Sequence, residues 1–175
     1  MNRSILATRP NHDRTTRYIS AWADQVLRIA KAKGDTVFDL PEGRANQREV
    51  ESILEKKKPD IVFLSGHGDE NRVCGQNNEV LVDANKNCLL LAEKVVYAIA
   101  CKSGKVLGPV SIRSGAKAFV GYKEDFIFMI ASEKRTRPLE DKTAELFLEP
   151  SNQVVISLLK GQSAKTAHAN SRRAF

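Results

Sequence analysis

Two long apolar segments constrain the fold of this chain more than any other feature of its sequence. Residues 60–65 read DIVFLS, and residues 94–100 read KVVYAIA. Apolar runs without polar alternation are typical of parallel strands that helices cover on both faces. Further strands are predicted at residues 4–8, 36–40, 79–82, 117–120 and 126–130, with a polar loop at 68–78.

Helical patterns alternate with these strands. Periodicity predicts a first helix with Ile19, Trp22, Val26 and Ile29 on its buried face, and Gly34 marks its end. A capping box of Asn46 and Glu49 predicts the start of a second helix. Further helices are predicted at residues 106–113, 141–159 (interrupted near Pro150) and 163–173. The alternation predicts an α/β fold, a three-layer α/β/α sandwich on a mostly parallel sheet.

The length of 175 residues suits one domain, which would bury roughly two-thirds of its unfolded surface. We expect residues 1–160 to form this domain and residues 161–175 to form a polar C-terminal helix or tail. No internal repeat or linker divides the chain.

Charge, hydropathy and cysteine content limit the kinds of partner and the cellular environment that we expect for this protein. The formal net charge of +7 permits contact with nucleic acid, but the basic residues are spread along the chain, so we do not expect a nucleic-acid role. No segment approaches the roughly 20 apolar residues of a membrane span, and no secretory signal is visible, so no membrane partner is expected. The odd, sparse set of three cysteines predicts free thiols in a reducing, cytoplasmic environment.

A histidine and a cysteine follow the two long apolar segments. His67 comes two residues after the first segment, and Cys101 comes one residue after the second. Because the carboxyl ends of neighbouring parallel strands meet at one edge of a sheet, we expect the imidazole and the thiol to share one cleft. Their separation of 34 residues (101 − 67) leaves room for the crossover that parallel strands require. A thiolate beside an imidazole indicates a cysteine peptidase.

The neighbouring residues fit the same chemistry. The backbone N–H groups of Gly68 and Cys101 are candidate donors to the oxyanion that develops during peptide hydrolysis. The glycines on both sides of His67 predict close substrate approach and unusual backbone angles. Ser103 and Gly104 are expected to begin the next helix, whose N-terminal dipole would favour a thiolate.

These motifs resemble those of the caspase-like cysteine peptidases, a group that includes caspases, metacaspases, gingipains and separase. The resemblance spans residues 4–131 and is closest to the CHAT-domain peptidases, in the segments FLSGHG, AIACKSG and SGAKAFVGYKEDF. It implies a caspase-like sandwich and an endopeptidase acting on a protein or peptide, with His67 as the catalytic histidine, Cys101 as the nucleophile and Gly68 in the oxyanion hole. We expect no cofactor and no metal. The caspase signature Gln-Ala-Cys-x-Gly is absent, because Ile99 replaces the glutamine, so aspartate specificity is not implied.

Substrate preference rests on separate residues. A pocket for a basic side chain before the cleaved bond requires a carboxylate, and Asp13, Glu124 and Asp125 are the candidate substrate-binding residues. Any single one of them is more commonly a solvated loop charge, and Arg9 and Arg14 could instead receive an acidic side chain. We expect the basic preference.

Other kinds of site fit the sequence less well. His67 and the three cysteines lack the paired spacing of a structural zinc site, and no glycine-rich phosphate loop occurs. His12 and His168 are expected to be isolated and exposed. The main alternative to an enzyme is a catalytically silent or regulatory caspase-like module. A ligand, a partner or processing could activate the peptidase itself. In the alternative module, a regulatory protein, a nucleotide ligand or an upstream protease would release the domain, and the basic charge and the polar C-terminal helix fit that role.

Overall fold

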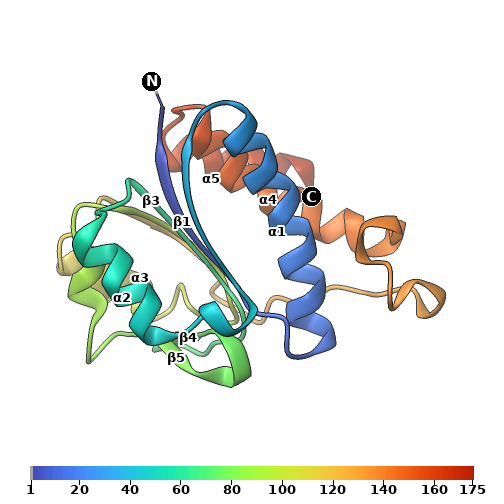
Figure 1. Cartoon of the computed structure of the whole chain (residues 1–175), viewed down its shortest axis with the longest axis horizontal. Coiled ribbons are helices and arrows are strands. Elements are labelled where there is room, and N and C mark those ends of the chain that lie inside the picture. Colours follow the sequence, from blue (N-terminus) through green and yellow to red (C-terminus); the bar gives the residue numbers. More distant parts are fainter. Residues whose placement is uncertain (1) are drawn as a thin grey trace.

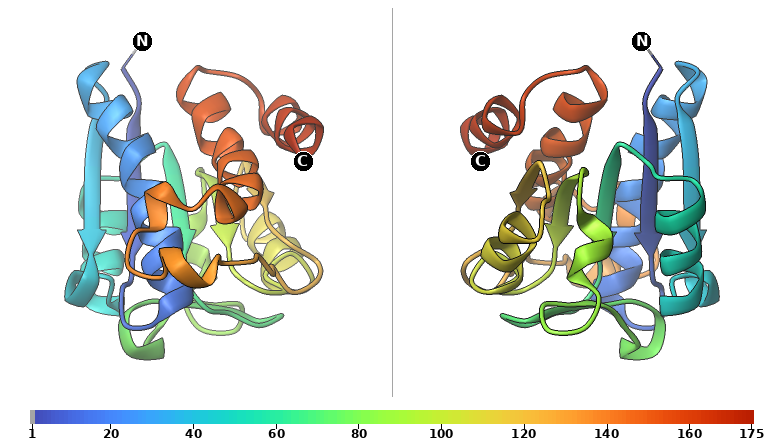
Figure 2. Two further views of the ribbon diagram at one scale, coloured as in Figure 1. Left: turned by 90° about the vertical axis from the view of Figure 1, so that its right-hand side faces the viewer. Right: turned by 90° about the vertical axis from the view of Figure 1, so that its left-hand side faces the viewer.

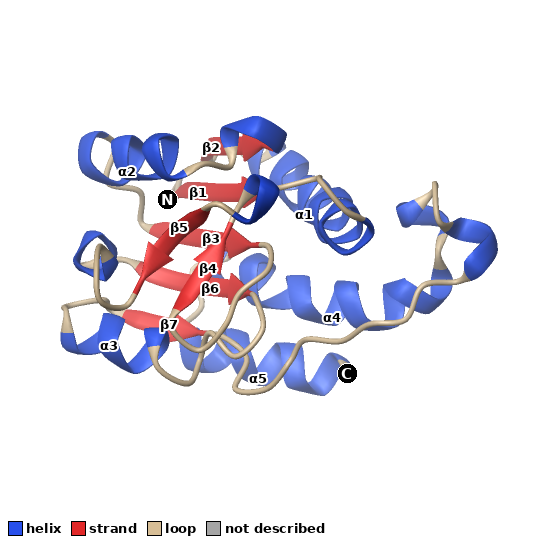
Figure 3. Cartoon of the chain, turned by 90° about the horizontal axis from the view of Figure 1, so that it is seen from below, coloured by secondary structure: helices blue, strands red, loops and turns tan. Residues whose placement is uncertain are grey.

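A parallel sheet of five strands lies at the centre of the computed structural model, which describes residues 2–175 (Figure 1). The strands lie in the order β2-β1-β3-β6-β7. Their bounds are β1 (Ser4–Arg9), β2 (Thr36–Pro41), β3 (Ile61–Ser65), β6 (Val95–Ile99) and β7 (Ala118–Val120). Seen from below, the five arrows lie side by side and point the same way (Figure 3).

Helices cover both faces of this sheet (Figures 1 and 2). One side carries α1 (Arg14–Ala32), α4 (Lys142–Leu159) and α5 (Ala164–Ala174), and the other carries α2 (Gln47–Lys56) and α3 (Leu107–Arg113). Short 3-10 turns lie at Glu42–Arg44, Gln76–Asn78, Cys88–Leu91, Ser132–Lys134 and Pro138–Glu140. The predicted α/β/α sandwich on a mostly parallel sheet is confirmed. No helix within residues 2–175 is long and apolar enough to cross a membrane.

Period-two alternation within the strands supplies two separate cores. In β3, Ile61 and Phe63 join the cluster beneath α1, α4 and α5, whereas Val62 and Leu64 join the cluster beneath α2 and α3. All of β3 is buried. Because each face of the strand meets a helix layer, neither face can be polar, and this explains the apolar run in the sequence.

Two expectations about the helices are wrong. Ile29 is 50% exposed, because the buried face of α1 continues through Leu27 and Ala30 instead. Pro150 does not interrupt α4, which runs unbroken from residue 142 to residue 159 with the proline buried inside it.

The expected strand at residues 126–130 is also absent. Phe126, Phe128 and Ile130 pack against the core beneath α1, while Ile127 and Met129 are exposed, so the side chains alternate as they would in a strand. The described sheet nevertheless ends at β7, and the segment has no ladder partner within residues 2–175. An alternating apolar pattern shows only that one side of a segment is buried. It does not show that another strand lies beside the segment to form backbone hydrogen bonds with it.

A small antiparallel pair lies at the carboxyl ends of the main strands, near the bottom of Figure 1. It consists of β4 (Arg72–Cys74) and β5 (Val80–Asp83). The sequence predicted β5 but assigned β4 to a polar loop, because three residues carry too little pattern. The Cys74 N–H donates to the His67 carbonyl at 2.8 Å, so this pair is joined to the segment that follows β3.

Asp141 ties together three segments on the α1 side of the sheet. Its buried carboxylate accepts hydrogen bonds from the N–H groups of Thr143 and Ala144, both at 3.0 Å, and so caps α4. It also accepts from the Ala131 N–H at 2.9 Å and the Tyr18 hydroxyl at 3.0 Å. Burial opposes its ionisation, but these donors outweigh burial and hold the pKa of Asp141 below its ordinary value. Burial and this carboxylate together raise the pKa of Tyr18 to about 12.

We expect Asp141→Ala to lower the free energy of unfolding by about 2–4 kcal/mol, since it removes a helix cap and leaves buried donors short of an acceptor. Urea unfolding would measure the loss. Glu140→Ala is the matched control: its ion pairs with Lys134 and Arg137 lie at the surface, so it should leave stability nearly unchanged. Equal effects of the two substitutions would contradict the anchoring role of Asp141.

Candidate active site

The loops that follow β1, β3 and β6 meet at one edge of the sheet. If the parallel strands are numbered one to five along the chain, their spatial order across the sheet is 2-1-3-4-5. The direction of this order reverses between β1 and β3, which makes their carboxyl ends the topological switch point of the sheet. Ligands commonly bind at such a point, outside the carboxyl ends of the strands. Asp13 follows β1 and His67 follows β3, so these two residues flank the switch point, and Cys101 follows the next strand.

His67 and Cys101 occupy equivalent places on adjacent strands. Ser65 pairs with Ile99 in the parallel ladder of β3 and β6, and each functional residue lies two positions beyond this pair. The Cys101 side chain is partly exposed, and about two-fifths of the His67 side chain is exposed (39%). The structure thus brings the two turns together at the edge where the sequence predicted them.

The glycines beside His67 serve chain packing. Gly66 has φ +151°, and a Cβ there would overlap the carbonyl oxygen of Cys74. A Cβ on Gly68 would lie 2.7 Å from the Arg72 carbonyl oxygen and 2.9 Å from the Ala100 Cβ. The expected unusual backbone angle is confirmed at Gly66. Both glycines also let neighbouring chain segments approach closely, so that the β4–β5 pair and the Cys101 turn pack against the histidine turn.

Two backbone donors at this edge are unengaged. Within residues 2–175, the N–H groups of Gly68 and Cys101 donate to no backbone carbonyl. The antiparallel bridge between Gly68 and Val73 uses the N–H groups of Asp69 and Cys74 instead. Neither candidate oxyanion donor is therefore committed to a backbone acceptor within the described residues.

The Cys101 turn is held by the loop after β7. Lys102 has φ +55°, a left-handed conformation that costs a non-glycine residue of order 1 kcal/mol. Its N–H donates to the Glu124 carbonyl at 3.2 Å, and the Gly104 N–H donates to the Tyr122 carbonyl at 2.8 Å. These two bonds fix the conformation that presents Cys101.

The expected helix dipole does not reach the thiol. α3 begins at Leu107 rather than at Ser103 and Gly104. The Leu107 N–H donates to the Glu70 carbonyl at 2.8 Å, and the Gly108 N–H donates to the Ser103 carbonyl at 3.0 Å. The first amides of this short helix are therefore occupied by protein, and the sequence-based expectation is wrong.

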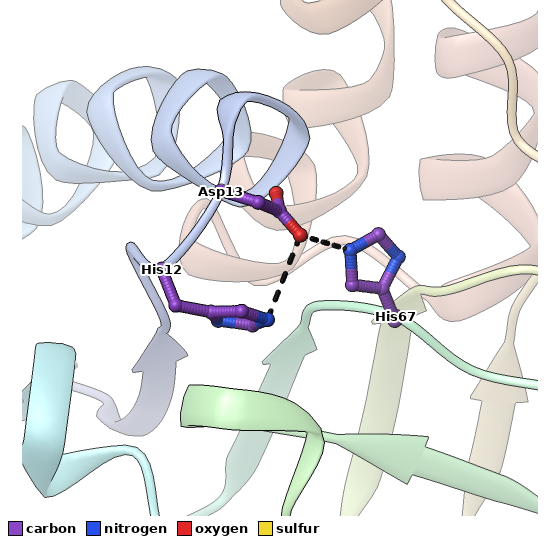
Figure 4. Close-up of side chains that lie close together, drawn as sticks. All are labelled: His12, Asp13 and His67. Carbon is purple, nitrogen blue, oxygen red and sulfur yellow. Dashed lines mark hydrogen bonds and ion pairs between the residues drawn. The ribbon is translucent and has the colours of Figure 1, made fainter.

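Asp13 links the start of α1 to the histidine. Its Oδ2 lies 2.5 Å from His67 Nε2, and its Oδ1 accepts from the Thr16 N–H at 2.8 Å in a capping box (Figure 4). Partial burial opposes ionisation, but the hydrogen bonds from Thr16 and His67 outweigh it and hold the pKa of Asp13 below its ordinary value. Asp13, a substrate-pocket candidate in the sequence, is thus bonded to the histidine.

His12 is a member of the site that sequence reasoning missed. Its side chain is only 12% exposed, and its Nε2 lies 3.5 Å from Asp13 Oδ2. Its ring centroid is 5.9 Å from that of His67. The expectation of an isolated, exposed histidine is wrong for His12, although His168 is exposed. The available signal was its position beside Asp13 in the loop after the first strand.

The other two substrate-binding candidates, Glu124 and Asp125, form ion pairs with lysines and have no contact with Asp13 among the described ion pairs. Glu124 is 3.7 Å from Lys105 Nζ, and Asp125 is 3.5 Å from Lys102 Nζ. Both carboxylates are well exposed, so these pairs are weak. They sit on the loop that holds the Cys101 turn.

Arg9 is engaged by acidic residues of the protein itself. Its Nε and Nη2 each donate to the Asp39 carboxylate at 2.8 Å, and its Nη2 lies 3.2 Å from Asp24. Burial opposes the charge, but these carboxylates outweigh burial and raise the pKa of the guanidinium. Arg14, the first residue of α1, is exposed.

Comparison with known proteins adds no assignment. The sequence matches no protein-family model, and no curated protein matches it significantly. The function is therefore argued from the geometry of this edge.

We expect a mild thiol-directed electrophile at neutral pH to label Cys101 before the other two cysteines. Burial raises the pKa of the Cys74 thiol, and the buried Cys88 Sγ donates to the Ala84 carbonyl at 3.1 Å. Mass spectrometry of tryptic peptides would report the order. Comparable labelling of all three thiols would show that the partial exposure of Cys101 confers no selectivity.

Asp13→Asn should leave the α1 cap in place but weaken the bond to His67. The cost should be less than about 1 kcal/mol, because solvent screens both half-exposed groups. Since the folded-state pKa of Asp13 lies below its ordinary value of 3.8, its stabilisation is present above pH 3.8 and is lost as pH falls below that value. Urea unfolding should therefore show the two proteins converging in acid. A difference that widens in acid would contradict this.

Proposed function

We propose that this protein is a cysteine endopeptidase of the caspase-like type, with Cys101 as the nucleophile and His67 as the acid–base residue. The single observation that carries the proposal is the placement of these residues two positions beyond a paired Ser65–Ile99, on adjacent parallel strands. The free N–H groups of Gly68 and Cys101 and the motif resemblance support it.

The reaction follows from these groups. His67 accepts the Cys101 proton, and the sulfur attacks the peptide carbonyl carbon while the π electron pair moves to oxygen. The N–H groups of Gly68 and Cys101 hold this oxyanion, each contributing about 3 kcal/mol. When the C–N bond breaks, His67 gives its proton to the leaving amine, and a thioester remains. Water then attacks the thioester, loses a proton to His67 and releases the carboxylic acid as the C–S bond breaks; the sulfur regains its proton from His67.

Asp13 acts in this scheme as a positioning residue. Its Oδ2 engages His67 Nε2 at 2.5 Å, which leaves Nδ1 as the ring nitrogen that exchanges protons with the thiol and the substrate. A carboxylate in this place also stabilises the imidazolium that forms when the thiol is deprotonated.

The substrate is proposed to be a protein or peptide with a basic residue before the cleaved bond. Support comes from Glu124 and Asp125, whose exposed carboxylates lie on the loop bonded to the Cys101 turn. A substrate cation would displace their weak lysine partners. Three free thiols support a reducing, cytoplasmic setting.

A regulatory module is the second candidate function, and a cavity favours it. A space of about 510 Å³ lies between the end of β7 and α5, lined by Tyr122, Lys123, His168 and Arg172 among others. Cationic and aromatic side chains together suit a nucleotide-like anion. The Tyr122 carbonyl also accepts a hydrogen bond from the Gly104 N–H in the Cys101 turn. A ligand bound in this cavity could therefore change the conformation of the turn that carries Cys101.

Cys101→Ala should reduce cleavage of a peptide library by at least about 10³-fold, as loss of a nucleophile does in other peptidases. The urea midpoint should change little, because only a partly exposed sulfur is lost. Cys88→Ala is the matched control, with activity retained. Cleavage that survives in Cys101→Ala, with contaminating proteases excluded, would reject the assignment.

The cleaved products of the same library report side-chain preference. Lysine or arginine before the cleaved bond is the expected result, and Glu124→Gln with Asp125→Asn should weaken that preference. A preference for acidic residues would refute the basic specificity while leaving the peptidase proposal intact. No cleavage of any peptide, with selective Cys101 labelling also missing, would favour the regulatory module.

A further inference from the structure

Three potential metal ligands converge at the loops that follow β1 and β3. His12, Asp13 and His67 each offer one ligand atom, and these atoms all lie within 4.8 Å of one another. Figure 4 shows both imidazole rings turned toward the same oxygen of Asp13. The distances to this Oδ2 are 2.5 Å from His67 Nε2 and 3.5 Å from His12 Nε2.

The His12 ring contacts the Asp13 carboxylate only at 3.5 Å, longer than an ordinary hydrogen bond. Within residues 2–175, its Nδ1 and Nε2 are buried and lack a hydrogen-bond partner. A buried unpaired polar group costs about 1–3 kcal/mol, so the fold holds this ring at a penalty that a ligand would remove. The proposed peptidase mechanism makes no use of it.

The carboxylate is oriented for the task by its surroundings. Asp13 Oδ1 is taken by the Thr16 N–H and hydroxyl, at 2.8 and 3.0 Å, which leaves Oδ2 to face the two rings. The Thr16 hydroxyl oxygen also accepts from the N–H groups of His12 and Asp13, at 3.2 and 3.1 Å. One threonine thus fixes the backbone of both residues, the outer support that metal ligands usually have.

We infer that His12 Nε2, Asp13 Oδ2 and His67 Nε2 bind one transition-metal ion of the Zn²⁺ type. Two imidazoles and one carboxylate, with a fourth position open to water, form a common zinc ligand set, whereas Ca²⁺ and Mg²⁺ prefer oxygen ligands alone. Zn–N bonds of about 2.0–2.1 Å place tetrahedral ligand atoms about 3.4 Å apart, so small side-chain rotations suffice. More than a third of the Asp13 and His67 side chains is exposed, at 38% and 39%, which gives the ion a route from solvent.

The ion would also control the enzyme. A metal on His67 Nε2 takes the lone pair of that nitrogen in place of the hydrogen bond to Asp13. The neutral ring then carries its proton on Nδ1, the nitrogen that the proposed mechanism needs as proton acceptor, so it cannot take the thiol proton and return it to the leaving amine. Metal occupancy and peptide hydrolysis are therefore mutually exclusive. This consequence rests on the proposed peptidase function, whereas binding of the ion does not.

Calorimetric titration of chelator-treated protein with Zn²⁺ tests the site without any activity assay. We expect one ion per chain, with binding weakened more than about 100-fold in His12→Ala, because loss of an outer-shell partner alone costs 10–100-fold. His12→Gln serves as a second variant if the alanine variant does not fold, and circular dichroism checks each protein. The matched control is His168→Ala, which removes an exposed histidine on α5 and should bind as the wild type does.

Co²⁺ substitution identifies the ligands. Bands typical of nitrogen and oxygen ligation, unchanged in Cys101→Ala, support the site. A strong sulfur charge-transfer band that disappears in Cys101→Ala would place the ion on the thiol and overturn the inference. So would absent binding by the wild type, or equal binding by the wild type and the His12 variants.

Activity assays separate this inference from the proposed function. Zn²⁺ should inhibit the wild type, and His12→Ala should lose that inhibition relative to its own metal-free rate. Binding at the three residues without any peptidase activity would leave the metal site standing and reject the function. Peptidase activity without Zn²⁺ binding would do the reverse.

Discussion

Parallel pairing of β3 with β6 is the constraint on which the rest of this molecule depends. The register Ser65–Ile99 determines that the histidine and cysteine turns emerge side by side. That register is fixed because both strands are covered on both faces, so a one-residue slip would exchange the contents of the two cores. The apolar residues that bury β3 and β6 therefore also bring His67 and Cys101 to equivalent positions at the ends of these strands.

Close backbone packing then completes the edge. Gly66 and Gly68 let the β4–β5 pair and the Cys101 turn approach the histidine turn more closely than any side chain would allow. The loop after β7 holds the opposite side of that turn through Glu124 and Tyr122. Three segments that are separate in sequence thus fix the surroundings of Cys101, and the Gly68 and Cys101 amides remain free among them.

The loop after β1 connects helix formation to the chemistry. Asp13 caps α1 with one oxygen and holds His67 with the other, so a local folding signal also orients a candidate catalytic group. The same capping box draws His12 inward beside the pair. In our proposals, the Asp13 carboxylate either accepts a hydrogen bond from His67 or binds a metal ion together with His67 and His12. His67 can exchange a proton with the thiol only in the first case.

The sequence by itself determined the α/β class, most strands and helices, and the placement of His67 and Cys101 at neighbouring strand ends. It could do so because burial on two faces and helix end signals are written in local patterns. Only the tertiary structure decided that β4 pairs with β5, that residues 126–130 remain outside the sheet and that α3 starts too late to act on the thiol. It also decided that the His12 side chain is mostly enclosed and that Asp13 bonds to His67. Those outcomes depend on which distant segments supply a hydrogen-bond partner or cover a side chain, and no local pattern encodes them.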